Sequence, residues 1–477
     1  MIETLWTSAA AARATGGTVT QSFTASGISI DTRALERGDL FVALKDVRDG
    51  HDFVAQALEK GAAAALVSHR PEGLPDDAPL LIVPDVLEGL EALAAAARRR
   101  MQGKVVAVTG SAGKTSTKEM LRDVIGDQAR VHVAEASYNN HWGVPLTLAR
   151  MPRETEIAVI EIGMNHPGEI EPLARLARPH VALITTIAPA HLEAFPSVEA
   201  IAEEKATIFK GLVRGGVAVI NGDLPTTGLM VARARAERAR VLRFGESRGC
   251  HHRLTEVMFT DRCLVCHARA WRTPVTYKVS ATGRHFAMNG LAVLAVAHVL
   301  GLDRALALSS IGRWTPPAGR GLRQWRVLDP LDRALSFELI DDAFNANPVS
   351  MAAALDVLAA SNPRDNLGRF SEGRRIAILG EMLELGPQEA EMHRALADLP
   401  ALNDIDLIHC VGPRMRAFYE ALPDHRRGRF EETVTPLSRD PMRLVDAGDV
   451  VLIKGSKGSR VSLLVDALRK LSHPAEE

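Results

Sequence analysis

The feature that most constrains the fold is the segment VVAVTGSAGKTSTKEML at residues 105–121. Its largely β-branched run Val105–Val108 predicts a buried strand, Gly110–Gly113 predicts a tight loop, and the residues from Thr115 onward predict a helix. Glycines let backbone N–H groups converge on one point, and the helix N-terminus adds a positive partial charge. Strand, glycine loop, lysine and hydroxyl residue together predict a phosphate-binding site.

The loop itself is two residues shorter than the usual GxxxxGK[ST] pattern. We expect Lys114 to reach the terminal phosphates of a nucleotide and the Thr115 hydroxyl to bind Mg²⁺. A plain glycine turn with an exposed lysine is the alternative, but strand, loop, Lys and Thr all agree in order and context. The residues predicted to bind ATP here are Gly110, Ser111, Ala112, Gly113, Lys114, Thr115 and Ser116.

Short β-like runs alternate with helical stretches along most of the chain, which predicts an α/β protein with mostly parallel sheets. The 477 residues are too many for one core. Over 240–280 the pattern changes to short β-like pieces, where we expect an antiparallel patch, and a Pro- and Gly-rich linker follows near 315–321. We therefore predict three domains: a small α/β domain at 1–100, a central P-loop ATPase domain at 101–315 and a Rossmann-like domain at 316–477.

Charge and cysteine content exclude several classes of partner. The 57 basic and 58 acidic residues nearly cancel, so no global field attracts nucleic acid or an anionic membrane, and a small-molecule partner is favoured. Four cysteines form no disulfide framework in so long a chain, the N-terminus lacks the pattern of a signal peptide, and no run of ~18 apolar residues predicts a membrane span. We expect a cytoplasmic, reduced protein.

Three further residues follow strands of the predicted central sheet. Glu161 lies in the apolar run IAVIEIGMN, where an unpaired carboxylate is costly, so it is a candidate Mg²⁺ ligand; a glutamate facing solvent at the sheet edge is the alternative. His191 follows the strand-like VALITTI, and Lys205 lies on the next predicted helix. Each alone is typical of a surface, but their place after a strand of the same sheet makes them candidates.

Four longer stretches carry a resemblance to a known family: YNNHWGVPLTL at 138–148, EIGMNHPGEI at 161–170, HFAMNGLAVLAVA at 285–297 and DDAFNANPVSM at 341–351. With its short phosphate loop, the chain resembles the Mur ligases from about residue 28 to residue 467. The resemblance implies an ATP-dependent amide ligase that joins D-alanyl-D-alanine to a UDP-N-acetylmuramoyl-tripeptide through an acyl phosphate, in peptidoglycan precursor synthesis. A sister ligase or folate polyglutamate ligase that adds one amino acid, and a P-loop switch protein, remain alternatives.

The resemblance also implies a metal site with two Mg²⁺ ions. Thr115 and Glu161 would hold one ion, His191 would help to hold the second, and Lys205 matches a lysine that is carbamylated in several family members. A carbamate turns a repelling cation into an anionic oxygen ligand. The other ATP-site residues implied are Asn289, Arg320, Asp342 and Asn345. We expect the protein to act as a monomer.

For the other substrates, the resemblance implies that the first domain binds the UDP end and the third binds nucleotide and dipeptide. The implied substrate-binding residues are Asp31, Thr32, Arg33, Asn139, Asn140, Lys454 and Ser456. Asp46 stands where the family usually has Gly, and Phe344 replaces a more usual Tyr. From the residues alone, the LIKGSKGS segment is either a contact for the dipeptide or a phosphate, or an ordinary solvated turn.

One cluster lies outside the resemblance: Cys250, His251, Cys263, Cys266 and His267 in CHHRLTEVMFTDRCLVCH. A CxxC with a nearby histidine can bind Zn²⁺. However, this CxxC is single, it lies in a β-like stretch, and the expected chemistry uses Mg²⁺. We therefore favour an interpretation without zinc and leave the metal binding of these cysteines open.

Overall fold

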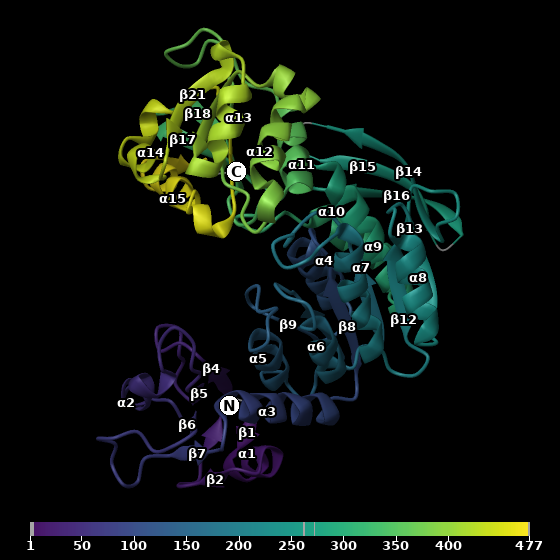
Figure 1. Ribbon diagram of the computed structural model, residues 1–477, viewed down its shortest axis with the longest axis vertical. Helices are drawn as coiled ribbons and strands as arrows, with labels where there is room; N and C mark the ends of the chain where they lie inside the picture. Colours follow the sequence, from purple (N-terminus) through teal and green to yellow (C-terminus); the bar gives the residue numbers. More distant parts are fainter. Residues whose placement is uncertain (1–3, 261–262, 271, 476–477) are drawn as a thin grey trace.

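The computed structural model describes residues 4–260, 263–270 and 272–475. Besides a two-stranded sheet near the N-terminus, three larger sheets follow one another along the chain, within residues 18–82, 104–279 and 322–474. We call the parts that carry them the N-terminal, central and C-terminal units. Figure 1 shows the N-terminal and C-terminal units at the two ends of the central unit, which gives the molecule a C-shaped outline.

The N-terminal unit has a five-stranded sheet in the order β2, β7, β6, β5, β4, and β1 pairs with β3 beside it. Its strands are β1 (Trp6–Thr7), β2 (Thr18–Val19), β3 (Thr24–Ala25), β4 (Gly27–Ser29), β5 (Asp39–Val42), β6 (Ala64–Val67) and β7 (Leu80–Ile82). Its helices are α1 (Ser8–Thr15), η1 (Gly50–Phe53), α2 (Val54–Glu59) and α3 (Val86–Arg100). Strands β4 to β7 pair in parallel, and β2 is an antiparallel edge.

Helix α3 joins this unit to the central one, where it packs on α5 (Gly143–Ala149) and α6 (Ile170–Ala177) (Figure 1). The buried Arg98 donates from Nε to the Ala177 carbonyl at 2.8 Å and from Nη2 to the Arg178 carbonyl at 2.9 Å. A guanidinium there satisfies free carbonyls at the end of α6 and complements the helix dipole. One hydrophobic cluster also runs from the N-terminal unit onto one face of the central sheet. The two units therefore share a core.

The central sheet has nine strands in the order β16, β15, β14, β13, β12, β11, β8, β10, β9. They are β8 (Lys104–Thr109), β9 (Val131–Val133), β10 (Ile157–Glu161), β11 (Val181–Ile184), β12 (Val217–Asn221), β13 (Arg240–Gly245), β14 (His252–Phe259), β15 (Leu264–Ala270) and β16 (Thr273–Val279). The antiparallel patch expected over 240–280 is confirmed for β14 to β16, whereas β13 pairs in parallel with both neighbours.

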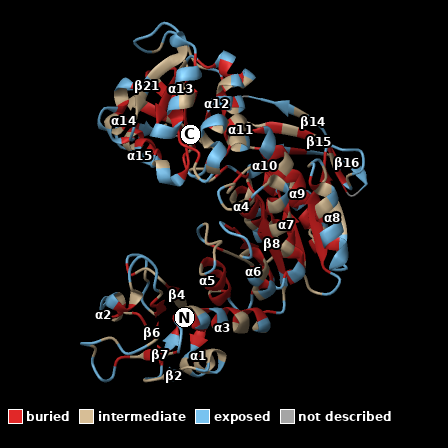
Figure 2. Ribbon diagram, viewed as in Figure 1, coloured by how far each residue is buried: buried red, intermediate tan, exposed pale blue. Residues whose placement is uncertain are grey.

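Helices cover both faces of this sheet, as the alternating pattern predicts. Besides α5 and α6 they are α4 (Lys114–Gly126), α7 (Val198–Ala206), η2 (Thr207–Gly211), α8 (Thr227–Ala236), α9 (Arg284–Leu300) and α10 (Arg304–Arg313). Helix α9 is apolar nearly all round because it packs between the sheet and the helices α4 and α10. Figure 2 shows the central strands as buried, while α8 exposes its outer face.

The C-terminal unit has seven strands in the order β21, β20, β19, β22, β18, β17, β23. They are β17 (Leu322–Asp329), β18 (Asp332–Asp342), β19 (Arg375–Gly380), β20 (Leu407–Val411), β21 (Arg427–Glu431), β22 (Val450–Lys454) and β23 (His473–Pro474). The α-helices are α11 (Pro348–Ala359), α12 (Glu389–Ala395), α13 (Arg416–Ala421), α14 (Thr435–Arg439) and α15 (Ser462–Lys470). Short 3₁₀ turns are η3 (Gly386–Gln388), η4 (Leu396–Asp398), η5 (Pro400–Asp404), η6 (Pro413–Met415), η7 (Asp424–Arg426), η8 (Pro441–Arg443) and η9 (Lys457–Ser459).

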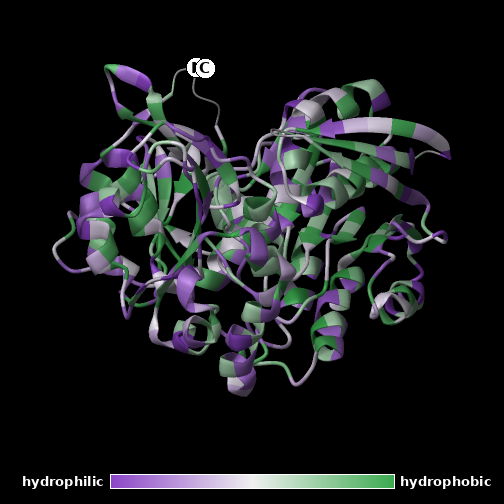
Figure 3. Ribbon diagram, turned by 90° about the horizontal axis from the view of Figure 1, so that it is seen from above, coloured by the Kyte–Doolittle hydropathy of each residue, from purple (hydrophilic) through white to green (hydrophobic). Residues whose placement is uncertain are grey.

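The three strands predicted beyond the linker are β19, β20 and β22, and they form the parallel centre of this sheet. Each face of the sheet carries its own hydrophobic cluster, separate from those of the other two units. Figure 3 shows hydrophobic residues through the interior and hydrophilic residues toward the periphery. The C-terminal unit therefore has a core of its own.

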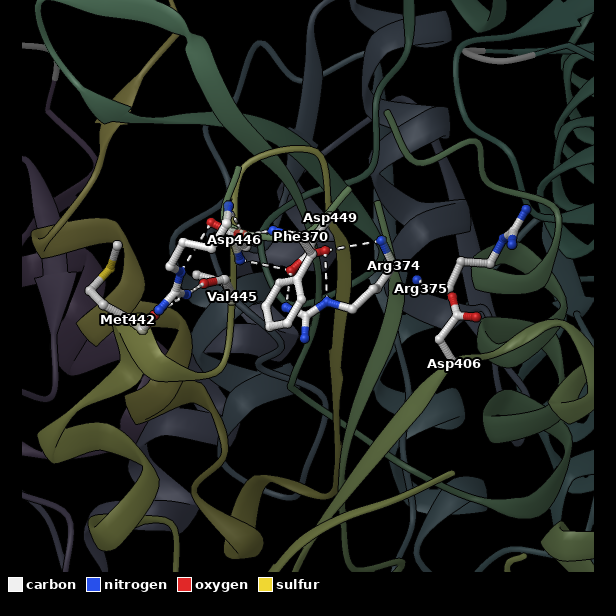
Figure 4. A network of polar contacts seen from close by, with 9 residues as sticks. Phe370, Arg374, Arg375, Asp406, Met442, Val445, Asp446 and Asp449 are labelled. Carbon is white, nitrogen blue, oxygen red and sulfur yellow. Dashed lines mark hydrogen bonds and ion pairs between the residues drawn. The ribbon is translucent and has the colours of Figure 1, made fainter. Parts of the chain in front are cut away.

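A polar network fixes the starts of β19 and β22 (Figure 4). Arg374 donates to the two carboxylate oxygens of Asp449, at 3.1 Å from Nε and 2.6 Å from Nη2, and Asp449 is only 1% exposed. The Asp446 carboxylate accepts the Phe370 backbone N–H at 3.1 Å, and Arg375 N donates to Asp406 at 2.7 Å. The network is structural and lies at the end of the sheet opposite the loops described below.

No helix in the described part of the chain has the length and apolar character that a bilayer-spanning segment requires.

Candidate active site

The phosphate loop lies where β8 ends and α4 begins, as predicted, and it is held by the segment that follows β11. Thr185 Oγ1 donates to the Ala112 carbonyl at 2.6 Å, Ser111 Oγ donates to the Ala188 carbonyl at 3.0 Å, and Ala188 N donates back to Ser111 Oγ at 3.0 Å. A Cβ at Gly110, whose φ is 153°, would collide with the Thr185 hydroxyl. The loop therefore has a fixed shape that only glycine permits at this point.

The first residues of α4 place a cation and a hydroxyl at the loop. Lys114 Nζ donates to the Gly110 carbonyl at 2.6 Å, and burial lowers the pKa of this lysine while the nearby Glu161 raises it. Thr115 Oγ1 donates to Glu161 Oε1 at 3.3 Å. The side chain of Ser116 is buried in the first turn of the helix. Lys114 and Thr115 thus lie together with the predicted carboxylate.

Glu161 is the last residue of β10 and is 1% exposed, so a solvent-facing position is wrong. Its Oε1 accepts from Asn139 Nδ2 at 2.7 Å as well as from Thr115. Its Oε2 is buried and has no hydrogen-bond partner within residues 4–260, 263–270 and 272–475. A buried carboxylate oxygen without a partner is unfavourable unless a cation binds it. A carboxylate beside a hydroxyl provides the oxygen ligands that Mg²⁺ prefers.

Lys205 is completely buried on α7, and its Nζ has no hydrogen-bond partner in the described part of the chain. Burial, and then the charge of Lys114, lower the pKa of Lys205 well below its usual value. The amine is therefore held toward its neutral form, which is the form that reacts with CO₂.

His191 lies in the loop after β11 with a φ of 59°, and its Nδ1 is 2.5 Å from Glu384 Oε2. Glu384 belongs to the loop after β19, so this ion pair crosses from the central to the C-terminal unit. The bond to His191 is the main reason why the pKa of Glu384 lies below its ordinary value.

Of two further residues predicted for the nucleotide site, Asn289 borders the phosphate loop and Arg320 lies near enough to Lys114 to lower its pKa. Asn289 on α9 is buried, and a Cβ at Gly113 would lie 3.0 Å from its Oδ1. The Arg320 guanidinium stacks on the Phe344 ring, with its Cζ 4.1 Å from the ring centroid. This stacking needs only the ring, so Phe344 retains it without the hydroxyl of the more usual Tyr.

Lys454 and Ser456 are buried, so the interpretation of their segment as a solvated turn is wrong for both residues. Lys454 is the last residue of β22, and its Nζ donates to Asp342 Oδ2 at 2.7 Å and to the Asn345 carbonyl at 2.9 Å. Ser456 Oγ accepts the Leu383 backbone N–H at 3.0 Å. The structure thus joins Lys454 to two residues predicted for the ATP site.

The predicted substrate residues Asp31, Thr32 and Arg33 line a cavity of about 1020 Å³ in the N-terminal unit. Asp31 Oδ2 accepts a hydrogen bond from Arg33 Nη2 at 2.6 Å, and Thr32 Oγ1 donates one to Gln56 Oε1 at 2.8 Å. Side chains of the central unit also border the cavity: Tyr138, His141 and Trp142. The cavity also contains Asp46, the residue that departs from the family pattern.

Asn139 and Asn140, which were also predicted to bind substrate, are not among the residues that line this cavity. Asn139 donates to Glu161, as described, and Asn140 Oδ1 accepts the Gly143 N–H at 2.9 Å at the start of α5. Asn139 is therefore grouped with the candidate metal ligands, and Asn140 with a helix terminus.

The cysteine cluster gives no metal centre in the described residues, where no group of three or more His, Cys, Asp and Glu is placed to hold an ion. Cys266 is buried in the core on β15, which raises the pKa of its thiol to about 11 and disfavours the thiolate that zinc requires. Cys263 Sγ lies 3.0 Å from the Thr260 hydroxyl.

Two residues of the site do not follow from the sequence reasoning above. Thr185 orders the phosphate loop, and Glu384 reaches His191. Only their position in the sequence could have indicated these two residues. Each follows a strand of a parallel sheet, and ligands bind beyond the carboxyl ends of such strands.

A phosphate loop hydrogen-bonded to a buried carboxylate, with a buried lysine in the same unit, is an arrangement that suits an enzyme acting on nucleotides. The chain belongs to the Mur ligase family: residues 108–297 match the Mur ligase middle domain, 330–457 the Mur ligase glutamate ligase domain and 24–100 the Mur ligase family catalytic domain. This confirms the family and the α/β fold predicted from sequence.

Its relatives include the UDP-N-acetylmuramoyl-tripeptide--D-alanyl-D-alanine ligase of Rickettsia prowazekii, which is 30% identical over 97% of this chain and 99% of the relative. A crystal structure of MurF from Acinetobacter baumannii matches with a TM-score of 0.82 at 28% identity, covering 98% of this chain and 99% of that one. MurF ligase from Thermotoga maritima in complex with ADP matches with a TM-score of 0.75 at 26% identity, covering 93% and 97%.

Proposed function

We propose that this protein is an ATP-dependent ligase that joins D-alanyl-D-alanine to a UDP-N-acetylmuramoyl-tripeptide, in peptidoglycan precursor synthesis. The observation that carries the proposal is the Glu161 carboxylate, which is held by Thr115 and Asn139 beside the phosphate loop with one buried oxygen unpartnered in the described chain. The names of the full-length relatives, and the ADP complex of a structural neighbour, support the choice of substrates.

Two Mg²⁺ ions complete the proposed site. Thr115 and Glu161 would hold one, and His191 would help to hold the other. Bound there, the ions neutralise negative charge on the nucleotide and on the carboxylate that approaches it.

Lys205 is the proposed site of a carbamate. Its neutral amine attacks the carbon of CO₂, a C–N bond forms, and the electron pair of one C–O π bond moves onto oxygen. One proton passes from the nitrogen to solvent, so that an anion replaces a potential cation. The complete burial of Nζ and its lack of a partner in the described chain favour this modification. The product would supply an anionic oxygen ligand for Mg²⁺.

The reaction has two steps. A terminal carboxylate oxygen of the tripeptide attacks the γ-phosphorus of ATP, a P–O bond forms, and the bond to ADP breaks, which leaves an acyl phosphate. The amine of D-alanyl-D-alanine then attacks the acyl carbon, loses a proton, and inorganic phosphate leaves. Lys114 and the N–H groups of the phosphate loop stabilise the charge that develops on the transferring group.

The three predicted domains divide the substrates between them. We propose that the UDP end binds in the cavity that contains Asp31, Thr32 and Arg33, that ATP lies between the central and C-terminal units, and that the dipeptide binds near Lys454 and Ser456. A cytoplasmic, monomeric enzyme is the simplest form that suits this small-molecule chemistry.

A coupled assay of phosphate release tests the proposed function. Release should require ATP, UDP-N-acetylmuramoyl-tripeptide and D-alanyl-D-alanine together, and single amino acids should not replace the dipeptide. A sister ligase or folate ligase would instead accept one amino acid. ATP hydrolysis that neither substrate affects would contradict a ligase and favour a nucleotide switch.

The Glu161→Gln variant tests the observation on which the proposal depends. It keeps the size of the side chain but removes its charge, and we expect it to lower kcat by at least about 100-fold. Glu156→Gln, at an exposed position just before β10, is the matched control and should retain full activity.

A further inference from the structure

Two loops that follow strands of different sheets meet at His191 and Glu384. His191 Nδ1 is buried and lies 2.5 Å from Glu384 Oε2, an ion-pair distance, and it makes no hydrogen bond of regular geometry within the described residues. The Glu193 backbone N–H donates to the Glu384 carbonyl at 3.4 Å. A Cβ at Gly386 would lie 3.1 Å from the Leu192 carbonyl oxygen, so the two backbones are in close contact. The central and C-terminal units therefore touch through backbone as well as through side chains.

Both partners of this ion pair have a strained backbone. The φ of His191 is 59° and that of Glu384 is 64°, although neither residue is glycine. This region of φ is unfavourable for a non-glycine residue, and such residues cluster where function holds them in place. Two of them facing each other across a unit boundary indicate that the position of these side chains matters.

Each loop is anchored in its own unit. The start of the His191 loop is fixed to the phosphate loop through Ser111 and Ala188. In the other loop, Met382 N donates to the buried His393 Nε2 at 3.0 Å, and Leu383 N donates to Ser456 Oγ at 3.0 Å. Glu384 is thus presented to His191 by a built loop.

We propose that Glu384 is a positioning residue that accepts the Nδ1–H of His191 and so leaves Nε2 of the ring as the nitrogen available to a divalent cation. A carboxylate on one ring nitrogen fixes the tautomer and the orientation of a histidine ligand. The C-terminal unit would thereby complete a cation site that otherwise belongs to the central sheet. This inference rests on the proposed function, which assigns His191 to the second ion.

The test compares three full-length variants by two measurements that need no turnover. The His191 tautomer is read from imidazole ¹⁵N chemical shifts in the metal-free protein, and Mn²⁺ affinity is measured with a non-hydrolysable ATP analogue bound. Glu384→Ala removes the acceptor, and Glu384→Gln keeps an oxygen acceptor without the charge. Glu193→Ala, an exposed change in the same loop, is the control.

We expect the wild-type protein to hold the Nδ1–H tautomer and two Mn²⁺ ions. Glu384→Ala should lose that tautomer and weaken the second Mn²⁺ by roughly 10- to 100-fold. Glu384→Gln should keep the tautomer and most of the affinity, and Glu193→Ala should change neither. Unchanged Mn²⁺ affinity in Glu384→Ala, an equal loss in Glu193→Ala, or a single Mn²⁺ in the wild type would overturn the proposal. A wild-type protein with this Mn²⁺ pattern but no ligase activity would contradict only the proposed function.

Discussion

At the scale of single residues, the site contains buried ionisable groups that the fold alone does not explain. Glu161 Oε2 and Lys205 Nζ are both buried, and neither has a hydrogen-bond partner in the described residues. Burying such groups is unfavourable, so they reduce the stability of the protein in the absence of its ligands. Function is the natural reason to retain them.

Replacing Lys205 by Met should separate stability from activity. Met fills a similar volume without a charge, so we expect Tm to rise by about 2 to 4 °C in metal-free, bicarbonate-free buffer. Phosphate release should fall by about 100-fold because Met cannot form the proposed carbamate. Lys210→Met, which removes a surface ion pair with Glu171, is the control and should change neither quantity appreciably. Full activity of Lys205→Met would refute the carbamate.

The phosphate loop was predictable because its glycines, lysine and hydroxyl residue lie next to one another in the sequence, and their order alone indicates the loop. Glu161 was predictable because burying a carboxylate within an apolar strand is costly unless a cation or a hydrogen-bond donor meets it there. The hydrogen bond of Asn139 to Glu161 and the contact of Glu384 with His191 could not be predicted, because they join segments that are far apart in the chain.

At the scale of the elements, β19 and β22 depend on the network around Asp449 (Figure 4). Asp449→Ala leaves the partly buried Arg374 without its carboxylate and should cost about 3 kcal/mol. Asp440→Ala removes a pair with Arg443 that is exposed, and should cost under about 1 kcal/mol. Calorimetry of the two variants measures the difference, and equal losses would mean that the buried network adds nothing.

Strand β20 should make the C-terminal unit sensitive to acid. His409 is buried, its Nδ1 accepts the Arg429 N–H at 2.9 Å, and burial lowers its pKa from 6.5 to about 4. Its neutral form is therefore favoured in the fold. Above pH 6.5 the His409 side chain is neutral in the unfolded chain as well. Below pH 6.5 it binds a proton in the unfolded chain but not in the folded one, so the free energy of unfolding falls as pH falls toward 4.

The expected loss attributable to His409 is up to about 3 kcal/mol at pH 4. His409→Asn keeps an acceptor for Arg429 but does not titrate. Its Tm should fall less than that of the wild type between pH 6.5 and 4.5, and parallel curves would show that His409 does not set this acid sensitivity.

Most elements of the fold were predictable, because alternating apolar strands and helices leave few arrangements other than parallel sheets. The parallel pairing of β13 could not be predicted, since its sequence is no more apolar than that of the antiparallel strands after it. Burial of Lys454 was likewise hidden, because its ion pair with Asp342 joins two strands that are 112 residues apart.

At the scale of the whole molecule, the N-terminal unit shares a core with the central unit, while the C-terminal unit has a separate core. The first two units are thus expected to move as one body, which carries the cavity proposed for the UDP end of the substrate, and the third unit is expected to move against it. The residues that we propose for the nucleotide site are distributed across this second boundary, from Asn289 on α9 to Asp342 at the end of β18. Such a division suits a reaction in which three substrates must be brought together.

The use of ATP to activate a carboxylate can be followed through a single oxygen atom. With UDP-N-acetylmuramoyl-tripeptide labelled by ¹⁸O in its terminal carboxylate, an acyl phosphate delivers one labelled oxygen to inorganic phosphate for each amide bond formed with D-alanyl-D-alanine. We predict that mass spectrometry will find this single ¹⁸O in the released phosphate. Unlabelled phosphate would show that water attacks ATP, and would contradict the claim that this site spends ATP on activating a carboxylate.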